Sequence, residues 1–482
     1  MLESLPNSEN SPRLRFDVVN VDHIRELRIF GQRREDFSDF QGSLRENGEE
    51  LLLACELTSS NAQGVRKHLP WLNPKPLGLN LSAGVGDRLG LATSGHARAF
   101  RKYGKEVLPV FAQQSIREMV RLERTPQAVM DDATFGLVEA SWVDAVGSDA
   151  DHLKTSEDID ACLSAGFTLF TLDPGAYVFQ VPEDFDGKLS HLPWSALEDS
   201  ETAMIARYEG ISFDVAGKSI SMDSDEIRRA AFKYGAAVAY TVSQYRHLMQ
   251  HASYPVEVEV AIDETDDVTT FGEHIFMATE MKRLGMSWVS FAPRYVDGFE
   301  KGLEFKGDID LLASNLEGHA SIAKLFGPYK LSLHSGSDKF GIYSMAHDVT
   351  GGLLHLKTSG TSYLEALGVS AVYAPALFRE IYDVSRTAYE QARSSYQVSA
   401  DFNKAPRSQD LSDDDLGELL MRSDTRQILH VGYGAALSIE GSVGEFRLRN
   451  ALKLCLIENK PYYDQAMELH IGRHLALLGS SS

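Results

Sequence analysis

Short apolar runs recur along the chain from about residue 77, and stretches with helical spacing lie between them. The eight strand-like runs span 77–82, 107–113, 142–148, 166–173, 256–263, 287–292, 330–334 and 353–357. The intervening helical stretches include 114–122, 157–163, 273–284 and 309–326. Eight strands alternating with helices are what a closed parallel barrel needs, so the pattern predicts an α/β fold, a (β/α)8 TIM-like barrel. An open doubly wound sheet is the alternative.

Three segments extend beyond a minimal barrel. Residues 1–75 form a predicted N-terminal layer with a helix near 49–57, and residues 76–369 form the barrel. The interval 174–255 is too long for one crossover, so we expect an inserted subdomain that ends in a helix over 224–250 and could cover the barrel mouth. Residues 370–482 have a helical pattern and are expected to pack on the barrel.

Composition narrows the class of partner. With 43% hydrophobic and 24% charged residues among 482, the chain is typical of a globular protein. A formal net charge of -22 argues against nucleic acid or an anionic membrane as the main partner. We therefore expect a small molecule, and an anionic substrate would need a local basic pocket.

Cysteine usage and the first residues indicate the compartment. The three cysteines show no CxxC spacing, so neither a disulfide framework nor a cysteine zinc site is expected. Residues 1–15 have no apolar core, and no segment approaches the roughly 20 apolar residues of a spanning helix. The sequence predicts a cytoplasmic protein without signal peptide or membrane anchor.

The fifth run, VEVEVAID, places acids on one face of a strand. Because side chains alternate along a strand, Glu259 and Asp263 lie opposite Val258 and Val260. In a barrel the apolar face meets the helices, so the acids point inward, where they need a metal, a cation or a proton. An amphipathic strand with one wet face is the alternative.

The seventh and eighth runs add inward histidines by the same alternation. His334 lies opposite Leu331 and Leu333, and His355 lies opposite Leu354 and Leu356. A single strand histidine is more often a hydrogen-bonded core residue than a ligand. Two beside acids favour a divalent metal site for Zn, Mn or Ni, because imidazole and carboxylate suit these ions.

The stretch GSDADHLKT after the third run carries further ionisable groups. We interpret it as the loop after that strand, with His152 as a third metal ligand beside His334 and His355. Asp151 would act as a general base and Glu259 as its acid partner. A polar turn capping the next helix is the alternative.

Several cations near strand ends are candidates for an anionic substrate group. Lys339 and Lys357 lie in the Gly- and Ser-rich stretches after the last two runs, and Arg294 ends the sixth. Asp87 and Arg88 in the first loop are interpreted as a substrate-facing or structural ion pair. No dinucleotide or P-loop fingerprint is present.

At these residues the sequence resembles the tagaturonate epimerase family of bacterial sugar-acid enzymes. The resemblance covers most of the chain in order, and it departs from the family's pattern at LNLSAGVG and at 344–349. The matching stretches are GVGDRLGLATSGHARAF (84–100), QQSIREM (113–119), DADHLKT (149–155), FTLDP (170–174), EVAIDET (259–265), APRYVDGFEKG (292–302), KLSLHSGSDKFGIY (330–343), LHLKTSGTSYLEAL (354–367), LHVGYG (429–434) and GRHL (472–475).

The resemblance implies a metal-dependent isomerase that interconverts D-tagaturonate and D-fructuronate. The inverted carbon lies one position beyond the carbon alpha to the ketone, so the ketone does not acidify its hydrogen. A retro-aldol route with a metal-stabilised enediolate avoids that difficulty, and a transient keto shift is the mechanistic alternative. A ketohexose 4-epimerase (fructose/tagatose), a class II type aldolase and a sugar-acid binding protein remain alternative functions. The sequence does not decide whether His319 or His430 is a ligand.

Overall fold

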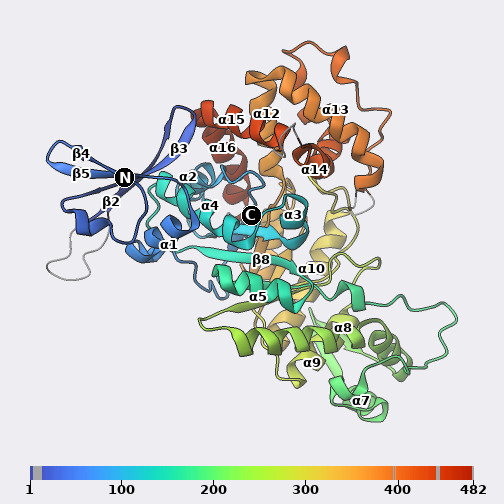
Figure 1. Ribbon diagram of the computed structural model, residues 1–482. Helices are drawn as coiled ribbons and strands as arrows, with labels where there is room; N and C mark the ends of the chain where they lie inside the picture. Colours follow the sequence, from blue (N-terminus) through green and yellow to red (C-terminus); the bar gives the residue numbers. More distant parts are fainter. Residues whose placement is uncertain (4–12, 394–395, 397, 441–445, 480–482) are drawn as a thin grey trace.

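The computed structural model describes residues 1–3, 13–393, 396, 398–440 and 446–479 (Figure 1). Residues 4–12, which carry most of the prediction that the chain has no signal peptide, lie outside the described residues.

Eight parallel strands close into a barrel, in the order β12-β13-β14-β15-β6-β7-β8-β9. The predicted closed barrel is therefore confirmed, and the open sheet is excluded. The barrel strands are β6 (Ser82–Gly84), β7 (Leu108–Ser115), β8 (Gly147–Leu153), β9 (Leu169–Leu172), β12 (Glu257–Ala261), β13 (Ser290–Ala292), β14 (Lys330–Leu333) and β15 (Leu354–Lys357).

The largest shifts are at β6 and β8, which each begin five residues later than their apolar runs predicted. The run 77–82 was expected to be the first strand, but β6 begins only at Ser82, because the amides of Leu77 and Gly78 bind the carboxylate of Glu257. The run 142–148 was expected to be the third strand, but Trp142 and Val146 pack in the core before β8 begins. At both sites the apolar residues lie in the segment that precedes the barrel strand. The strand β8 itself is formed by the polar stretch that follows.

Helices cover the barrel between its strands. Their starts follow local caps: Thr270 and Glu273 form a capping box at α9, and Asp223 and Glu226 form one at α8. The four predicted helices coincide with or overlap observed ones. The set is α2 (Thr93–Tyr103), α3 (Ile116–Arg121), α4 (Pro126–Glu139), α5 (Ser156–Ala165), α8 (Ser224–His251), α9 (Phe271–Arg283), α10 (Ile309–Phe326), α11 (Tyr343–Thr350) and α12 (Thr361–Tyr373).

The amino-terminal residues form an antiparallel sheet at one end of the molecule (Figure 1). The helix expected near 49–57 is wrong: ELLLAC is β5, which pairs with β3 and β4 on either side. Leucine favours helices locally, but pairing on both edges overrides that preference. The elements are β1 (Leu2–Glu3), β2 (Arg15–Val21), β3 (Ile24–Gly31), β4 (Ser43–Asn47), β5 (Glu50–Cys55) and α1 (Ser59–His68).

The interval between β9 and β12 holds α6 (Trp194–Leu197), α7 (Glu201–Tyr208), the hairpin β10 (Ser212–Val215) and β11 (Lys218–Ser221), and α8. This insertion packs on the outer side of the barrel: Tyr208 donates to Glu280 of α9 at 2.7 Å, and Phe213 contacts Phe326 of α10. Its helix over 224–250 is confirmed as α8. The division of the chain into domains at 75, 174–255 and 369 stays a prediction.

The carboxy-terminal segment is helical, as predicted, and it forms a second apolar core together with α12 and the loop at 89–92. Its helices are α13 (Pro375–Ala392), α14 (Ser423–Leu437), α15 (Arg447–Glu458) and α16 (Lys460–Leu478). The last of them packs against α2 and α12 of the barrel, and α14 lies near the barrel mouth (Figure 1).

Candidate active site

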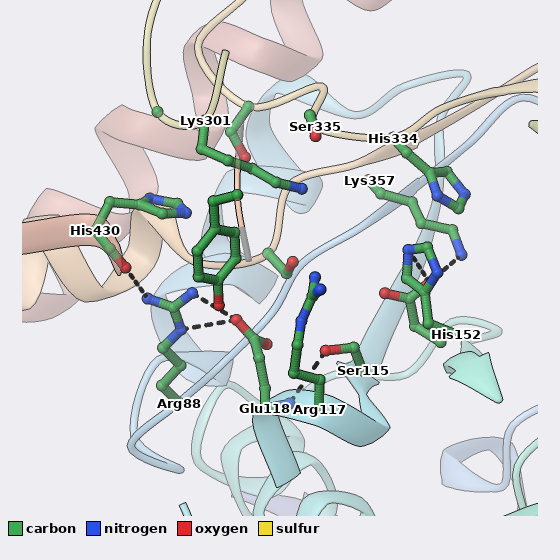
Figure 2. A pocket seen from close by; sticks show the side chains of 15 residues that line it. Arg88, Ser115, Arg117, Glu118, His152, Lys301, His334, Ser335, Lys357 and His430 are labelled. Carbon is green, nitrogen blue, oxygen red and sulfur yellow. Dashed lines mark hydrogen bonds and ion pairs between the residues drawn. The ribbon is translucent and has the colours of Figure 1, made fainter. Parts of the chain in front are cut away.

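A pocket of about 550 Å³ opens at the carboxyl ends of the barrel strands (Figure 2). Parallel barrels collect functional side chains at this face. Its lining comes from strands, from the loops that follow them and from the carboxy-terminal segment. The lining residues are Arg88, Ser115, Arg117, Glu118, Asp151, His152, Lys301, Gly302, His334, Ser335, Ser337, Lys357, Ser359, Tyr396 and His430. None of these residues comes from the insertion, so in this structure the insertion does not cover the mouth.

Asp151 and His152 both face this pocket because β8 is irregular at this point. The register with β9 shifts between Ala150 and Leu153, and His152 has a left-handed backbone with φ 55°. Neighbouring side chains of a regular strand point to opposite faces, whereas this break turns both inward. The two residues therefore lie on a strand, not on the loop that the sequence predicted. Backbone strain of this kind concentrates at functional sites.

Lys357 lies at the centre of a buried group of acids. Its Nζ is 2.8 Å from Asp149 Oδ2, 2.7 Å from Asp151 Oδ1 and 2.8 Å from Glu259 Oε1, and it donates to Thr171 at 2.8 Å. Burial lowers the pKa of Lys357, but the three carboxylates outweigh that and hold it well above its usual range. The ammonium is therefore charged and fully paired.

His334 lies between two carboxylates at the end of β14. Its Nε2 is 2.7 Å from Glu259 Oε1, and its Nδ1 is 2.9 Å from Asp263 Oδ1. Burial lowers the pKa of His334, but these acids raise it to about 9. The inward acids and histidine expected from strand alternation do meet here.

His152 packs edge-on against His334, with ring centroids 5.0 Å apart. Its Nδ1 is 3.3 Å from Asp173 Oδ2. Burial lowers the pKa of His152, whereas Asp151 and Asp173 raise it to about 10. Both imidazoles thus lie among carboxylates that favour the protonated, positively charged ring.

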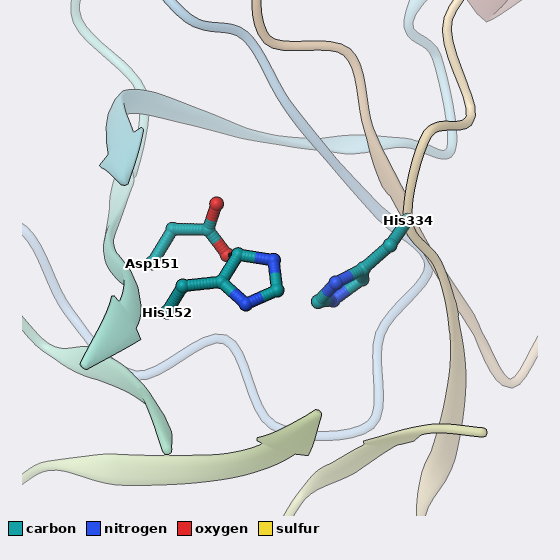
Figure 3. A group of neighbouring side chains, drawn as sticks. All are labelled: Asp151, His152 and His334. Carbon is teal, nitrogen blue, oxygen red and sulfur yellow. Dashed lines mark ion pairs between the residues drawn. The ribbon is translucent and has the colours of Figure 1, made fainter. Parts of the chain in front are cut away.

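Asp151, His152 and His334 offer ligand atoms that all lie within 4.8 Å of one another (Figure 3). His152 also belongs to a second such group with Asp173 and Glu264. Two imidazoles and a carboxylate fit a divalent transition-metal ion, and three protein ligands leave positions open for substrate. The donor set therefore fits the expected kind of cofactor.

His355, expected as the third histidine ligand, is not brought together with the other two. It points inward, but its Nδ1 is 2.9 Å from Ser82 Oγ, and no candidate ligand group among the described residues includes it. Burial lowers its pKa to about 3, which leaves a neutral ring. Asp151, and not His355, is the third member of the group with His152 and His334.

Glu259, expected as a catalytic acid, is completely buried and does not line the pocket. Its Oε1 contacts both His334 and Lys357. Glu259 can therefore act on a bound substrate only through these two side chains.

Two of the predicted anion ligands are engaged elsewhere. Lys339 is buried, and its Nζ donates to the carbonyls of Glu300 at 2.8 Å, Ser337 at 3.0 Å and Leu303. Arg294 lies in an adjoining recess that shares His334 and Ser335 with the pocket, and it pairs with Asp297 at 3.1 Å. Neither lines the pocket itself.

Asp87 and Arg88 do not pair with each other. The Asp87 carboxylate accepts from the amides of Leu89, Gly90 and Ala92, which is a structural role. Arg88 lines the pocket, where its Nε donates to Glu118 at 2.8 Å. The predicted ion pair is wrong, because loop amides bind the aspartate and Glu118 binds the arginine.

Some residues that line the pocket were missed by sequence reasoning. Arg117 and Lys301 lie within quoted motif stretches, but no periodicity assigned them a role, and Tyr396 lies outside those stretches. His430, left undecided by the sequence, lines the pocket from α14. His319 does not: it is buried against His274, 2.9 Å between their Nδ1 atoms.

Glycine allows the close approach of α14 to the pocket. Gly360 has a left-handed φ of 95°, and a Cβ there would lie 2.7 Å from both Arg88 Nη2 and His430 Cε1. Any other residue there would force these two side chains to shift.

A family model described as tagaturonate epimerase matches residues 8–478. The chain belongs to the tagaturonate epimerase family. It is an enzyme of the epimerase type, as the sequence predicted. No helix among the described residues of this epimerase is long and apolar enough to cross a membrane.

Relatives of known name and structure cover nearly the whole epimerase. A protein named tagaturonate/fructuronate epimerase, from Thermotoga maritima, is 36% identical over 465 residues, 96% of this chain and 94% of that protein. The native crystal structure of fructuronate-tagaturonate epimerase from Cohnella laeviribosi is 32% identical, with a TM-score of 0.89. A glycerol complex of the same protein is 31% identical, with a TM-score of 0.88. Both alignments cover 98% of this chain and 95% of the other.

Proposed function

We propose that the enzyme interconverts D-tagaturonate and D-fructuronate with the help of a divalent metal cation, by retro-aldol and aldol steps. The names of its relatives support the substrates. The observation that carries the chemistry is the buried group in which Lys357, Asp151 and two histidines meet at the pocket.

Counted from the hydroxymethyl end, the ketone is at C2, the inverted carbon is C4 and the carboxylate is C6. A base removes the C4 hydroxyl proton, the C3–C4 bond breaks, and its electron pair passes into the C2–C3 enediolate of the three-carbon fragment C1–C3. C4 becomes an aldehyde, and attack by C3 on the other face of that aldehyde gives the epimer. No carbon-bound hydrogen leaves at any step.

Asp151, His152 and His334 would hold the metal in this proposal. When bound, a divalent cation stabilises the negative charge of an enediolate. Zn, Mn and Ni all suit such a donor set.

Asp151 is the proposed base and Lys357 the proposed acid, in place of Glu259. Both line the pocket, and their contact of 2.7 Å lets Lys357 regain from Asp151 the proton that it gives to the new C4 alkoxide. Asp149 and Glu259 keep the ammonium paired while Asp151 carries the substrate proton. Glu259 is thus a positioning residue.

Turnover in deuterium oxide tests the route. After many turnovers we expect both epimers to carry no carbon-bound deuterium, measured by NMR and mass spectrometry. Stoichiometric uptake of deuterium at C4 would instead establish the keto shift and reject the retro-aldol proposal.

A further inference from the structure

The pocket carries more positive charge than the rest of the molecule. The chain has a formal net charge of -22, yet the pocket lining holds four lysine and arginine side chains against two carboxylates. The four are Arg88, Arg117, Lys301 and Lys357. A local excess of this sign attracts an anion to a protein that otherwise repels one.

Three of these cations already have carboxylate partners. Arg88 binds Glu118 at 2.8 Å through its Nε, and Lys357 has the three acids described above. Arg117 binds Glu264 through both terminal nitrogens, at 3.2 and 2.8 Å. A substrate carboxylate would have to compete with these ion pairs.

Lys301 differs from the other three. Among the described residues, no acceptor lies within hydrogen-bond or ion-pair distance of its Nζ. Figure 2 shows its side chain running from the loop above His430 into the pocket, toward the side that holds Lys357. The charge of Lys301 helps to lower the pKa of the Glu264 carboxylate, but Arg117 already binds that carboxylate directly. Lys301 is therefore the lining cation without a direct carboxylate contact, and it is open to a ligand.

The residues on both sides of Lys301 are held in place by contacts of the Glu300 carboxylate and of the Gly302 carbonyl. Glu300 accepts from Ser399 at 2.6 Å and from Gln427 at 2.8 Å, and the carbonyl of Gly302 accepts from Arg426 at 3.1 Å. Because the carboxy-terminal segment fixes this loop, a ligand pays little entropy to order it.

We infer that Lys301 binds the C6 carboxylate of the substrate and so makes the pocket select ketouronates over neutral ketohexoses. This inference rests on the proposed function. Cleavage of the C3–C4 bond leaves the carboxylate on the three-carbon aldehyde fragment, C4–C6. An ion pair at C6 keeps that fragment in the pocket while its aldehyde end turns to present the other face.

The test compares Lys301→Met, which keeps the length of the side chain but removes its charge, with Lys301→Arg. A matched control is Lys324→Met, which removes an exposed lysine from α10, away from the pocket. For Lys301→Met we expect kcat/KM with both ketouronates to fall about 10- to 100-fold, mostly through KM, the loss typical of a charged hydrogen bond. Lys301→Arg should recover part of the lost kcat/KM, and Lys324→Met should have the kcat/KM of the wild type.

Glycerate and glycerol provide a second measurement that does not need turnover of a neutral sugar. Glycerate should inhibit the wild-type enzyme more strongly than glycerol, and Lys301→Met should lose that preference. We also expect Lys301→Met to release three-carbon fragments during turnover, detected by coupled reduction of the aldehyde.

Two failures are distinguishable. A wild-type enzyme that is inactive on both ketouronates contradicts the proposed function. An active wild type together with a Lys301→Met variant that is folded, keeps KM within about twofold and still prefers glycerate overturns only the role of Lys301.

Discussion

The two sides of the pocket are built in different ways. The side with Asp151, His152 and Lys357 stands on barrel strands, and its charges form one closed, paired group. The side with Lys301 and His430 comes from a loop and from α14. Among the described residues, the Lys301 ammonium has no hydrogen-bond or ion-pair partner there. The strand side is arranged for proton and bond rearrangement, whereas the loop side is arranged for recognition.

The largest expected effect comes from removing the centre of the strand side. Lys357→Met takes away an acid and leaves three buried carboxylates unbalanced, so we expect kcat to fall at least about 1000-fold. The free energy of unfolding should fall by about 3 to 5 kcal/mol. Steady-state kinetics and denaturant unfolding measure the two effects.

A double variant separates stability from chemistry at this position. Asp149→Asn added to Lys357→Met should restore part of the stability but none of the activity, because it removes an unpaired charge and no substrate contact. Recovery of activity in the double variant, or a single variant that keeps a tenth of wild-type kcat, would contradict the role given to Lys357.

Metal content sharpens the comparison within the strand side. His152→Ala and His334→Ala should each lose most bound metal, because they remove an imidazole from the group with Asp151. His355→Ala should keep it, since His355 bonds to Ser82 instead. Elemental analysis of purified variants measures this, and a chelator followed by Zn, Mn or Ni should abolish and then restore wild-type activity. Full metal occupancy in His334→Ala would show that His334 is not a metal ligand.

The smallest expected effect concerns pH in the metal-free enzyme. Acids raise the folded-state pKa of His152 to about 10 and of His334 to about 9, above the unfolded value near 6.5. The stability that these charges contribute is complete below pH 6.5 and is lost as pH rises through 9 to 10. The midpoint of thermal unfolding of the metal-free enzyme should therefore fall by a few degrees between pH 7 and 10.

The same scan has an internal control. Metal-free His152→Gln/His334→Gln should show a flatter dependence of the unfolding temperature over this range, because it lacks both titrating groups. An equal slope in the variant and the wild type would assign the alkaline loss to other residues.

Much of the barrel was predictable because strand alternation is a local property. The inward placement of Glu259 and His334 follows from alternating apolar positions, and the structure brings both together with Lys357. His355 shows the limit of that reasoning. Alternation correctly predicted that the His355 side chain points inward. It did not predict how deep in the barrel the side chain lies, because that depth depends on the stagger of neighbouring strands.

Errors at the first and third runs have a common cause. Apolar residues such as Trp142 and Val146 are buried before their strand begins, so hydrophobicity marked burial and not strand position. The left-handed backbone at His152 gives no periodic signal, since it breaks the alternation on which the prediction depends.

The sequence by itself determined the barrel, the inward acids and histidines, and the family, because these are written in local periodicity and in motifs kept in order. Only the tertiary structure decided which ionisable groups meet. It paired Lys357 with three acids, bound Lys339 to backbone carbonyls and bound Arg88 to Glu118. Lys301 was left facing the pocket. The physical reason is that the partners of an ionisable side chain determine its protonation state and whether it can bind a ligand. Here those partners come from segments far apart in the chain.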